Sequence, residues 1–213
     1  MSIVDKWPGA RELLTRVKDI LFTPESEWEV IEAEPTTIRQ LFTRYACILA
    51  AIGPIAQLLG SQLFGYRALW VSYRPLLTTA LAQAVVGYVL ALAGVFITAM
   101  IVDALAPSFG GQSNRTQAFK VAIYSATAVW ISGVFALFPP VSSLGIIGIY
   151  SLYLLYLGLP RLMKAPKDKA LIYTIVIVVV SIVVTVVVTV LSGAVAGLTG
   201  LANVPSAGSI TVG

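Results

Sequence analysis

The side chains that could carry chemistry in this sequence are few, and they lie in or beside long apolar stretches. Asp103 is the only acid within such a stretch. An acid at membrane depth is a functional candidate because it could exchange protons along a transport path. Asp103 lies close to the end of its stretch, however, which favours a structural acid at the membrane boundary. We expect Arg115 or Lys120 to neutralise it.

Amide and hydroxyl side chains form a second candidate set. Gln57 and Gln83 are well placed at membrane depth, and Ser181, Thr185 and Thr189 recur every four residues in the last apolar stretch. Stripes of this kind let helix backbones approach closely and form hydrogen bonds between helices. Helix packing is therefore the default interpretation. A polar path for a solute would use the same groups.

Three tyrosines form the third set. Tyr150, Tyr153 and Tyr156 lie three residues apart, so they share one side of a predicted helix. They could line a pocket. Tyrosines packed in a helix bundle, with their hydroxyl groups hydrogen-bonded, are the more common arrangement.

The amino-acid composition argues against several other kinds of functional site. The sequence has no histidine, and its one cysteine, Cys47, lies in an apolar run. This argues against zinc sites of the usual kind, histidine acid–base catalysis and an internal disulfide. We expect no catalytic, cofactor-binding or metal site.

Composition also indicates where the chain is located. Of its 213 residues, 58% are hydrophobic and 11% are charged, whereas soluble domains carry about 25% charged residues. Most of the chain must therefore be solvated by lipid. Because the first 36 residues lack an early apolar core, we expect no cleavable signal peptide.

Five apolar stretches have about the 20 residues that a helix needs to cross a bilayer. They cover residues 41–64, 76–105, 119–138, 144–162 and 170–191. The fifth is rich in valine and isoleucine, but in lipid a helix satisfies its own backbone hydrogen bonds and is the safer prediction. We predict an all-α, polytopic membrane protein with a bundle of five transmembrane helices in residues 37–213 and a C-terminal tail.

Residues 1–36 are predicted to form a cytoplasmic segment with two short amphipathic helices. The first, over residues 8–22, could lie on the inner leaflet or pack on the bundle, and the sequence leaves both open. Thr23 and Pro24 indicate the start of the second. Five acids follow, which we interpret as a solvated helix face: Glu25, Glu27, Glu29, Glu32 and Glu34.

The distribution of positive charge predicts the threading. Twelve of the fourteen Lys and Arg residues fall in three regions: the N-terminal part up to Arg44, residues 115–120 around the second connection, and residues 161–169 around the fourth. The opposite side has only Arg67 and Arg74. Because cytoplasmic loops accumulate Lys and Arg, we expect a cytoplasmic N-terminus and an external C-terminus. This bias also explains the net charge of +4 without nucleic acid.

Four stretches together resemble the Yip1 family of small five-helix membrane proteins, in particular its bacterial branch. They are ILFTP at 20–24 with Trp28, AFKVAIYS at 118–125 with Lys120 and Tyr124, YSLYLLYLGLP at 150–160, and MKAPKDKA at 163–170. The resemblance implies five helices and a cytoplasmic N-terminus. Eukaryotic relatives are associated with Rab GTPases and carry an Asp-Leu-Tyr-Gly-Pro element. This chain lacks that element, so the GTPase role is not carried over.

These observations favour a non-enzymatic protein of the bacterial inner membrane that scaffolds partners or shapes the bilayer as an oligomer. Its partners would be the lipid bilayer and other copies of itself or other membrane proteins. The alternative is a small transporter or channel that uses the amides at membrane depth and the Ser/Thr stripe. An intramembrane enzyme would need a second catalytic group beside Asp103, and the sequence offers none.

Overall fold

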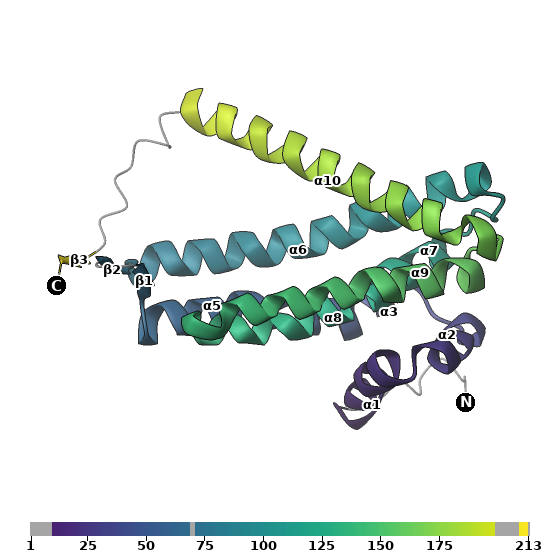
Figure 1. Ribbon diagram of the computed structural model, residues 1–213, viewed down its shortest axis with the longest axis horizontal. Helices are drawn as coiled ribbons and strands as arrows, with labels where there is room; N and C mark the ends of the chain where they lie inside the picture. The colour runs from purple at the N-terminus through teal and green to yellow at the C-terminus, as the bar shows by residue number, and fades with distance from the viewer. Residues whose placement is uncertain (1–9, 69–70, 199–208, 213) are drawn as a thin grey trace.

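The computed structural model describes residues 10–68, 71–198 and 209–212 (Figure 1). Long helices lie side by side along the longest axis of the molecule. A small sheet lies at one end of this bundle, and two short N-terminal helices lie against its side near the other end.

The two N-terminal helices are α1 (Ala10–Phe22) and α2 (Pro24–Ala33). Pro24 occupies the first turn of α2, where its missing N–H costs nothing. Thr23 is the N-cap residue, as predicted, but its side chain makes no capping hydrogen bond to α2. Its hydroxyl donates instead to the carbonyl of Asp19 at 3.0 Å, which links the end of α1 to the turn.

The first long helical stretch is interrupted. It consists of α3 (Ile38–Leu41), the π-helix η2 (Phe42–Ala46), α4 (Cys47–Ala50) and α5 (Ile52–Leu63). Thr37 and Gln40 form a capping box at its start. Pro54 cannot donate a backbone hydrogen bond and disfavours a regular turn before it, so the break between α4 and α5 at Ala51 has a local cause.

The next two stretches form a hairpin. The second consists of α6 (Leu77–Leu105) and η3 (Ala106–Phe109), and the third of α7 (Arg115–Ser125), α8 (Thr127–Ser132) and η4 (Gly133–Leu137). Asn114 begins α7, because its side chain accepts a hydrogen bond from the backbone N–H of Gln117 at 3.2 Å. Tyr88 ties α6 to the first stretch by donating to the carbonyl of Cys47 at 3.1 Å.

The remaining elements are η5 (Pro139–Ile149), α9 (Tyr150–Leu162) and α10 (Lys167–Leu198). A sheet accompanies the helices, formed by β1 (Tyr66–Ala68), β2 (Val71–Arg74) and β3 (Ser209–Val212) in antiparallel order β1-β2-β3. The helical prediction did not include this sheet. β3 belongs to the predicted C-terminal tail.

Four helical stretches of the described chain are long and apolar enough to cross a membrane: Ile38–Leu63, Leu77–Phe109, Arg115–Leu137 and Ser143–Leu162. They confirm a helical, membrane-spanning protein. The predicted fifth crossing falls in α10, which diverges from α6 towards its C-terminal end (Figure 1). That crossing stays a prediction.

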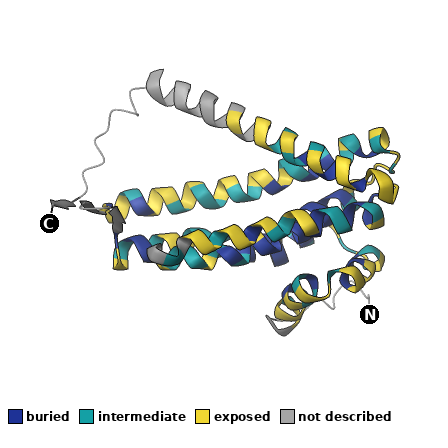
Figure 2. Cartoon of the chain, viewed as in Figure 1, coloured by how far each residue is buried: buried dark blue, intermediate teal, exposed yellow. Residues whose placement is uncertain are grey.

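The third stretch is the centre of the bundle. In its most apolar part 61% of the residues are buried, against 17% in the second stretch. Every residue from Ala118 to Ser125 is buried, whereas α6 and α10 expose apolar side chains along much of their length (Figure 2). Those exposed surfaces are the ones suited to contact lipid.

The first and third stretches approach closely at Gly60. A Cβ atom on this residue would lie 2.5 Å from the carbonyl oxygens of both Ala136 and Leu137 in η4. Because these are backbone atoms, a side chain at Gly60 could be accommodated only if the two helices moved apart.

We therefore predict that Gly60→Ala lowers the stability of the bundle by about 1–3 kcal/mol, because the extra methyl group overpacks a backbone contact. Gly94→Ala is the matched control in α6, since a Cβ there has no atom within 4 Å. Its stability should stay the same or rise slightly. Thermal unfolding in one detergent measures both, and equal melting temperatures for the two variants would contradict the close approach.

Candidate functional site

One side of the α7–α8 region carries polar side chains in an otherwise apolar segment. Gln117, Lys120, Tyr124 and Thr127 follow one another at steps of three, four and three residues. That spacing keeps them on one side of a helix. In this polar stripe Gln117, Lys120 and Tyr124 contact the N-terminal helices. Thr127 contacts the first helical stretch.

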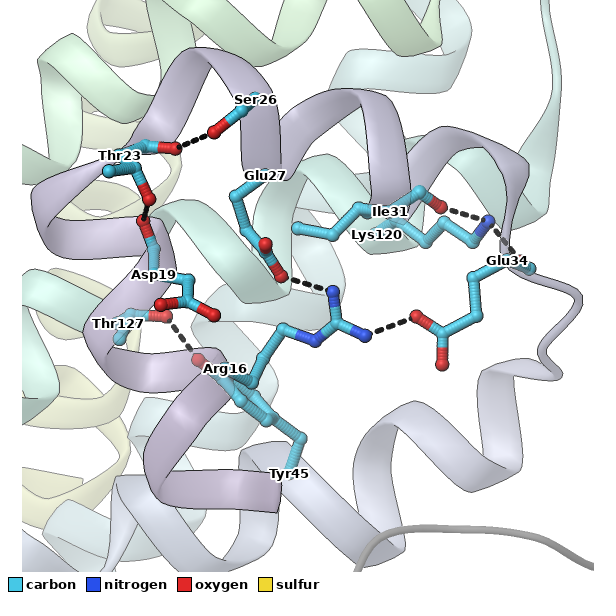
Figure 3. Close-up of polar contacts among 10 residues, drawn as sticks. All are labelled: Arg16, Asp19, Thr23, Ser26, Glu27, Ile31, Glu34, Tyr45, Lys120 and Thr127. Carbon is cyan, nitrogen blue, oxygen red and sulfur yellow. Dashed lines mark hydrogen bonds and ion pairs between the residues drawn. The ribbon is translucent and has the colours of Figure 1, made fainter. Parts of the chain in front are cut away.

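The amine of Lys120 is bound to the end of α2. It donates to the carbonyls of Ile31 and Glu34, each at 2.7 Å (Figure 3). A weaker hydrogen bond joins it to the Glu32 carbonyl at 3.3 Å. Gln117 adds a hydrogen bond from Nε2 to the Glu32 carbonyl at 3.2 Å. The last carbonyls of a helix lack partners within it and carry partial negative charge. Lys120, whose side chain is buried, therefore caps a different helix 86 to 89 residues away in sequence.

Arg16 fixes α1 to the same place. Its guanidinium forms ion pairs with Glu27 and Glu34 of the α2 region, and Figure 3 shows it between the two acids. It also lies 5.8 Å from the ring centre of Tyr124, a cation–π distance. Burial alone would lower the pKa of Arg16, but Tyr124, Glu34 and Glu27 together outweigh that effect and raise it. The side chain therefore stays charged.

Aromatic rings pack beneath this ion-pair cluster. Tyr45 meets Tyr124 with ring centres 4.7 Å apart, and its hydroxyl shares a 2.8 Å hydrogen bond with that of Thr127. Trp28 from α2 meets Tyr124 edge-on at 6.5 Å. A Cβ atom on Gly158 would lie 2.9 Å from the Trp28 indole. The missing side chain at Gly158 thus makes room for Trp28 against α9.

The interpretation of the acids as a solvated helix face holds for Glu25 and Glu29, which are exposed, but is wrong for Glu27, which is buried. Four of the five acids also form ion pairs. Glu27 and Glu34 pair with Arg16, Glu29 pairs with Arg161 at 2.6 Å, and Glu32 pairs with Lys164. The sequence could not show this, because each cation comes from a different helix or loop. The basic partner of the acids lies within the same chain.

The same contacts place the N-terminal helices against the bundle, one of the two placements that the sequence left open. Val17 and Ile20 of α1 and Ile31 of α2 are buried against the bundle. Tyr150 adds a hydrogen bond from its hydroxyl to the carbonyl of Leu21 at 3.1 Å. The helices pack on the bundle, and the side of α1 that carries Leu14 and Phe22 stays exposed.

The four stretches that resemble the Yip1 family meet at this cluster. Trp28 comes from the first, Lys120 and Tyr124 from the second, Gly158 from the third and Lys164 from the fourth. We call this contact region the docking cluster. Sequence analysis included Lys120 and Tyr124 but missed Arg16, Gln117 and Gly158. The polar periodicity of the stripe from Gln117 to Thr127 was the signal that could have identified it.

The other two tyrosines lie beside this cluster. Tyr153, whose ring centre is 5.3 Å from that of Tyr150, and Tyr156 line a cavity of about 360 Å³ between α2 and α9. Trp28, Arg161 and other residues complete its wall. The two interpretations of the tyrosines therefore both apply. Tyr150 packs in the bundle with its hydroxyl hydrogen-bonded, whereas Tyr153 and Tyr156 line a pocket.

Asp103 does not form the predicted ion pair. Its carboxylate accepts a hydrogen bond from the hydroxyl of Ser113 at 2.8 Å. Lys120 points to the α2 carbonyls instead, and Arg115 donates to the sulfur of Met100 at 3.4 Å. No ion pair of Asp103 occurs in the described part of the chain. Asp103 holds the α6–α7 connection as a hydrogen-bond acceptor.

The amides and the hydroxyl stripe lie away from the docking cluster. Gln57 and Gln83 line one crevice between α5 and α6, but this crevice has no room for a water molecule. Ser181 lies half-buried on α10, and the side chains of Thr185 and Thr189 lie outside the described residues.

The arrangement is suited to holding helices together. Its charged groups bind backbone carbonyls or one another. Among the described residues, no group of three or more His, Cys, Asp or Glu side chains could hold a metal ion.

We predict that Lys120→Met releases the N-terminal helices, because the α2 carbonyls lose a charged donor. The free energy of unfolding should fall by about 3 kcal/mol. Lys164→Met is the matched control, because the exposed pair with Glu32 is worth about 0–1 kcal/mol. Limited proteolysis within residues 10–33, together with thermal unfolding, measures both effects. Equal protection of the two variants would show that Lys120 does not hold α2.

Comparison with known proteins agrees with these features. A family model described as the Yip1 domain matches residues 18–189, a span that includes all the elements of the docking cluster except Arg16. The inner membrane protein YohC of Escherichia coli K12 is 28% identical over 170 residues, which cover 76% of this chain and 85% of YohC. YohC of E. coli O6:H1 matches to the same extent. No solved structure matches. This chain is an integral membrane protein that belongs to the Yip1 family.

Proposed function

We propose that this protein is a non-enzymatic scaffold of the bacterial inner membrane. The observation that carries the proposal is the docking cluster. In it Lys120 of the bundle binds the end of α2, and Arg16 of α1 pairs with acids of the α2 region. Helices held in this way present a fixed surface next to the bilayer. A fixed surface is what a scaffold needs, because binding a partner then costs little ordering entropy.

The outer side of these helices supports a role at the membrane surface. Leu14, Phe22 and Val30 expose 66%, 77% and 54% of their area, and Lys18 is exposed near Leu14 and Phe22. Apolar side chains with neighbouring cations suit a helix that touches anionic lipid. The bilayer or another membrane protein would cover this surface.

We propose that the chain divides into a cytoplasmic segment at residues 1–36 and a five-helix membrane domain at residues 37–213, with α10 as the fifth crossing. α10 has 32 residues and begins with Lys167 and Lys169. Its start and the N-terminal helices lie near the same end of the bundle (Figure 1), which supports a shared cytoplasmic side. The C-terminus would then lie outside.

Self-association is part of the proposal. α10 packs on the bundle near its beginning, where Tyr173 is buried, stacks on Phe109 at 4.7 Å and donates a hydrogen bond to the Val102 carbonyl. Farther along, Val179 and Ile182 are exposed. The stripe with Ser181, Thr185 and Thr189 would contact a helix of a second copy there.

Labelling of single cysteines tests the threading. Cysteines at Ser113 and Lys167 should react with an impermeant thiol reagent only from the cytoplasmic side, in a background with Cys47 replaced. A cysteine at Ser206, outside the described residues, should react only from the periplasmic side. The reason is the concentration of Lys and Arg in cytoplasmic loops. Labelling of Lys167 and Ser206 from one side would eliminate the fifth crossing.

Flux measurements test the scaffold itself. Purified protein in sealed vesicles should show no proton or solute flux above that of empty vesicles, and Asp103→Asn should change nothing, because Asp103 only accepts a hydrogen bond from Ser113. A proton-coupled transporter needs an acid that exchanges protons in a pathway. Flux that depends on pH and disappears in Asp103→Asn would overturn the proposal.

A further inference from the structure

The cavity between α2 and α9 has the properties of a lipid headgroup site. Its volume is about 360 Å³, and a neighbouring hollow of about 510 Å³ shares Glu25, Tyr153 and Arg161 with it. We propose that this cavity binds the headgroup of a phospholipid that carries both a phosphate and a primary ammonium group, as phosphatidylethanolamine does. The site is independent of the scaffold role.

Its position suits a headgroup. Arg161 lies near the end of the apolar stretch Ser143–Leu162, and Lys167 begins α10. Basic residues at the end of a membrane span lie at the level of lipid phosphates, and tyrosine and tryptophan are enriched at the same depth. Tyr153 and Trp28 contribute such rings to the wall, while Leu157 provides an apolar surface for the glycerol region.

The charged side chains of the cavity wall favour a headgroup that carries both a negative and a positive charge. Lys167 and Glu25 both line the cavity, yet within the described residues neither belongs to an ion pair. Arg161 is already paired with Glu29. A phosphate next to Lys167 and an ammonium next to Glu25 would satisfy both charges. A purely anionic headgroup would instead bring negative charge close to the Glu25 carboxylate.

The volume of the cavity matches this class of ligand, because small-molecule pockets span about 300–1,000 Å³. The indole ring of Trp28 is fully buried and packs on Gly158. It is therefore a rigid part of the wall, and its N–H does not reach a ligand.

Lipid titration of the detergent-purified full chain tests the proposal. Short-chain phosphatidylethanolamine and phosphatidylglycerol are added separately, and binding is followed by native mass spectrometry. The ethanolamine lipid should bind more tightly. Lys167→Gln should weaken its binding about tenfold, because one charge-assisted hydrogen bond is lost. The matched control is Lys164→Gln, which removes the same charge three residues away from a side chain that does not line the cavity, and it should bind like wild type.

A further variant tests the selectivity. Glu25→Gln should remove the preference for ethanolamine over glycerol headgroups, because the ammonium loses its partner. The melting temperature of each variant without lipid establishes that it is folded before binding is compared.

The outcomes separate the possible sources of the ligand. Free phosphoethanolamine and inorganic phosphate are added as competitors, and they should displace the lipid only at much higher concentration. If free phosphoethanolamine binds as tightly as the lipid, the cavity is a solute site and the lipid assignment is wrong. Equal losses in Lys167→Gln and Lys164→Gln, or an unchanged preference in Glu25→Gln, would also overturn the proposal.

Discussion

The structure depends on one interaction, the capping of α2 by the buried amine of Lys120. A lysine deprived of water is costly unless hydrogen bonds compensate its charge. Here the carbonyls of Ile31 and Glu34 accept its protons at 2.7 Å, and the negative end of the helix dipole points at it. Each side needs the other, because α2 would otherwise lose its cap and Lys120 its partners. The N-terminal segment and the membrane bundle are thereby coupled.

That coupling determines the environment of the neighbouring charges. Once α2 is in place, Glu27 and Glu34 lie within reach of Arg16, and Glu29 and Glu32 face the basic end of α9. Four of the five acids in and beside α2 are therefore paired within the chain. Trp28 can approach α9 because Gly158 has no side chain in the way. The same approach creates the wall of the cavity between the two helices.

Within the bundle, close approach replaces the hydrophobic effect as the main source of cohesion. Lipid chains are as apolar as leucine, so helices gain little by withdrawing apolar surface from lipid. Contact between backbones, as at Gly60 and η4, supplies van der Waals packing instead. The buried α7–α8 region provides both this packing and the polar stripe that holds the N-terminal helices, whereas α6 and α10 expose apolar side chains.

The sequence by itself determined that lipid surrounds most of this protein and where some of its helices begin. Apolar length predicted the membrane helices, and Thr23 with Pro24 predicted the start of α2, because both are signals that lie along one segment of the chain. Only the tertiary structure decided which charges meet. Lys120 could have neutralised Asp103 by proximity in sequence, but it binds α2 instead, 89 residues from Ile31. Periodicity shows which side chains share a side of a helix. It does not show which helix that side contacts, because long-range packing decides the contact.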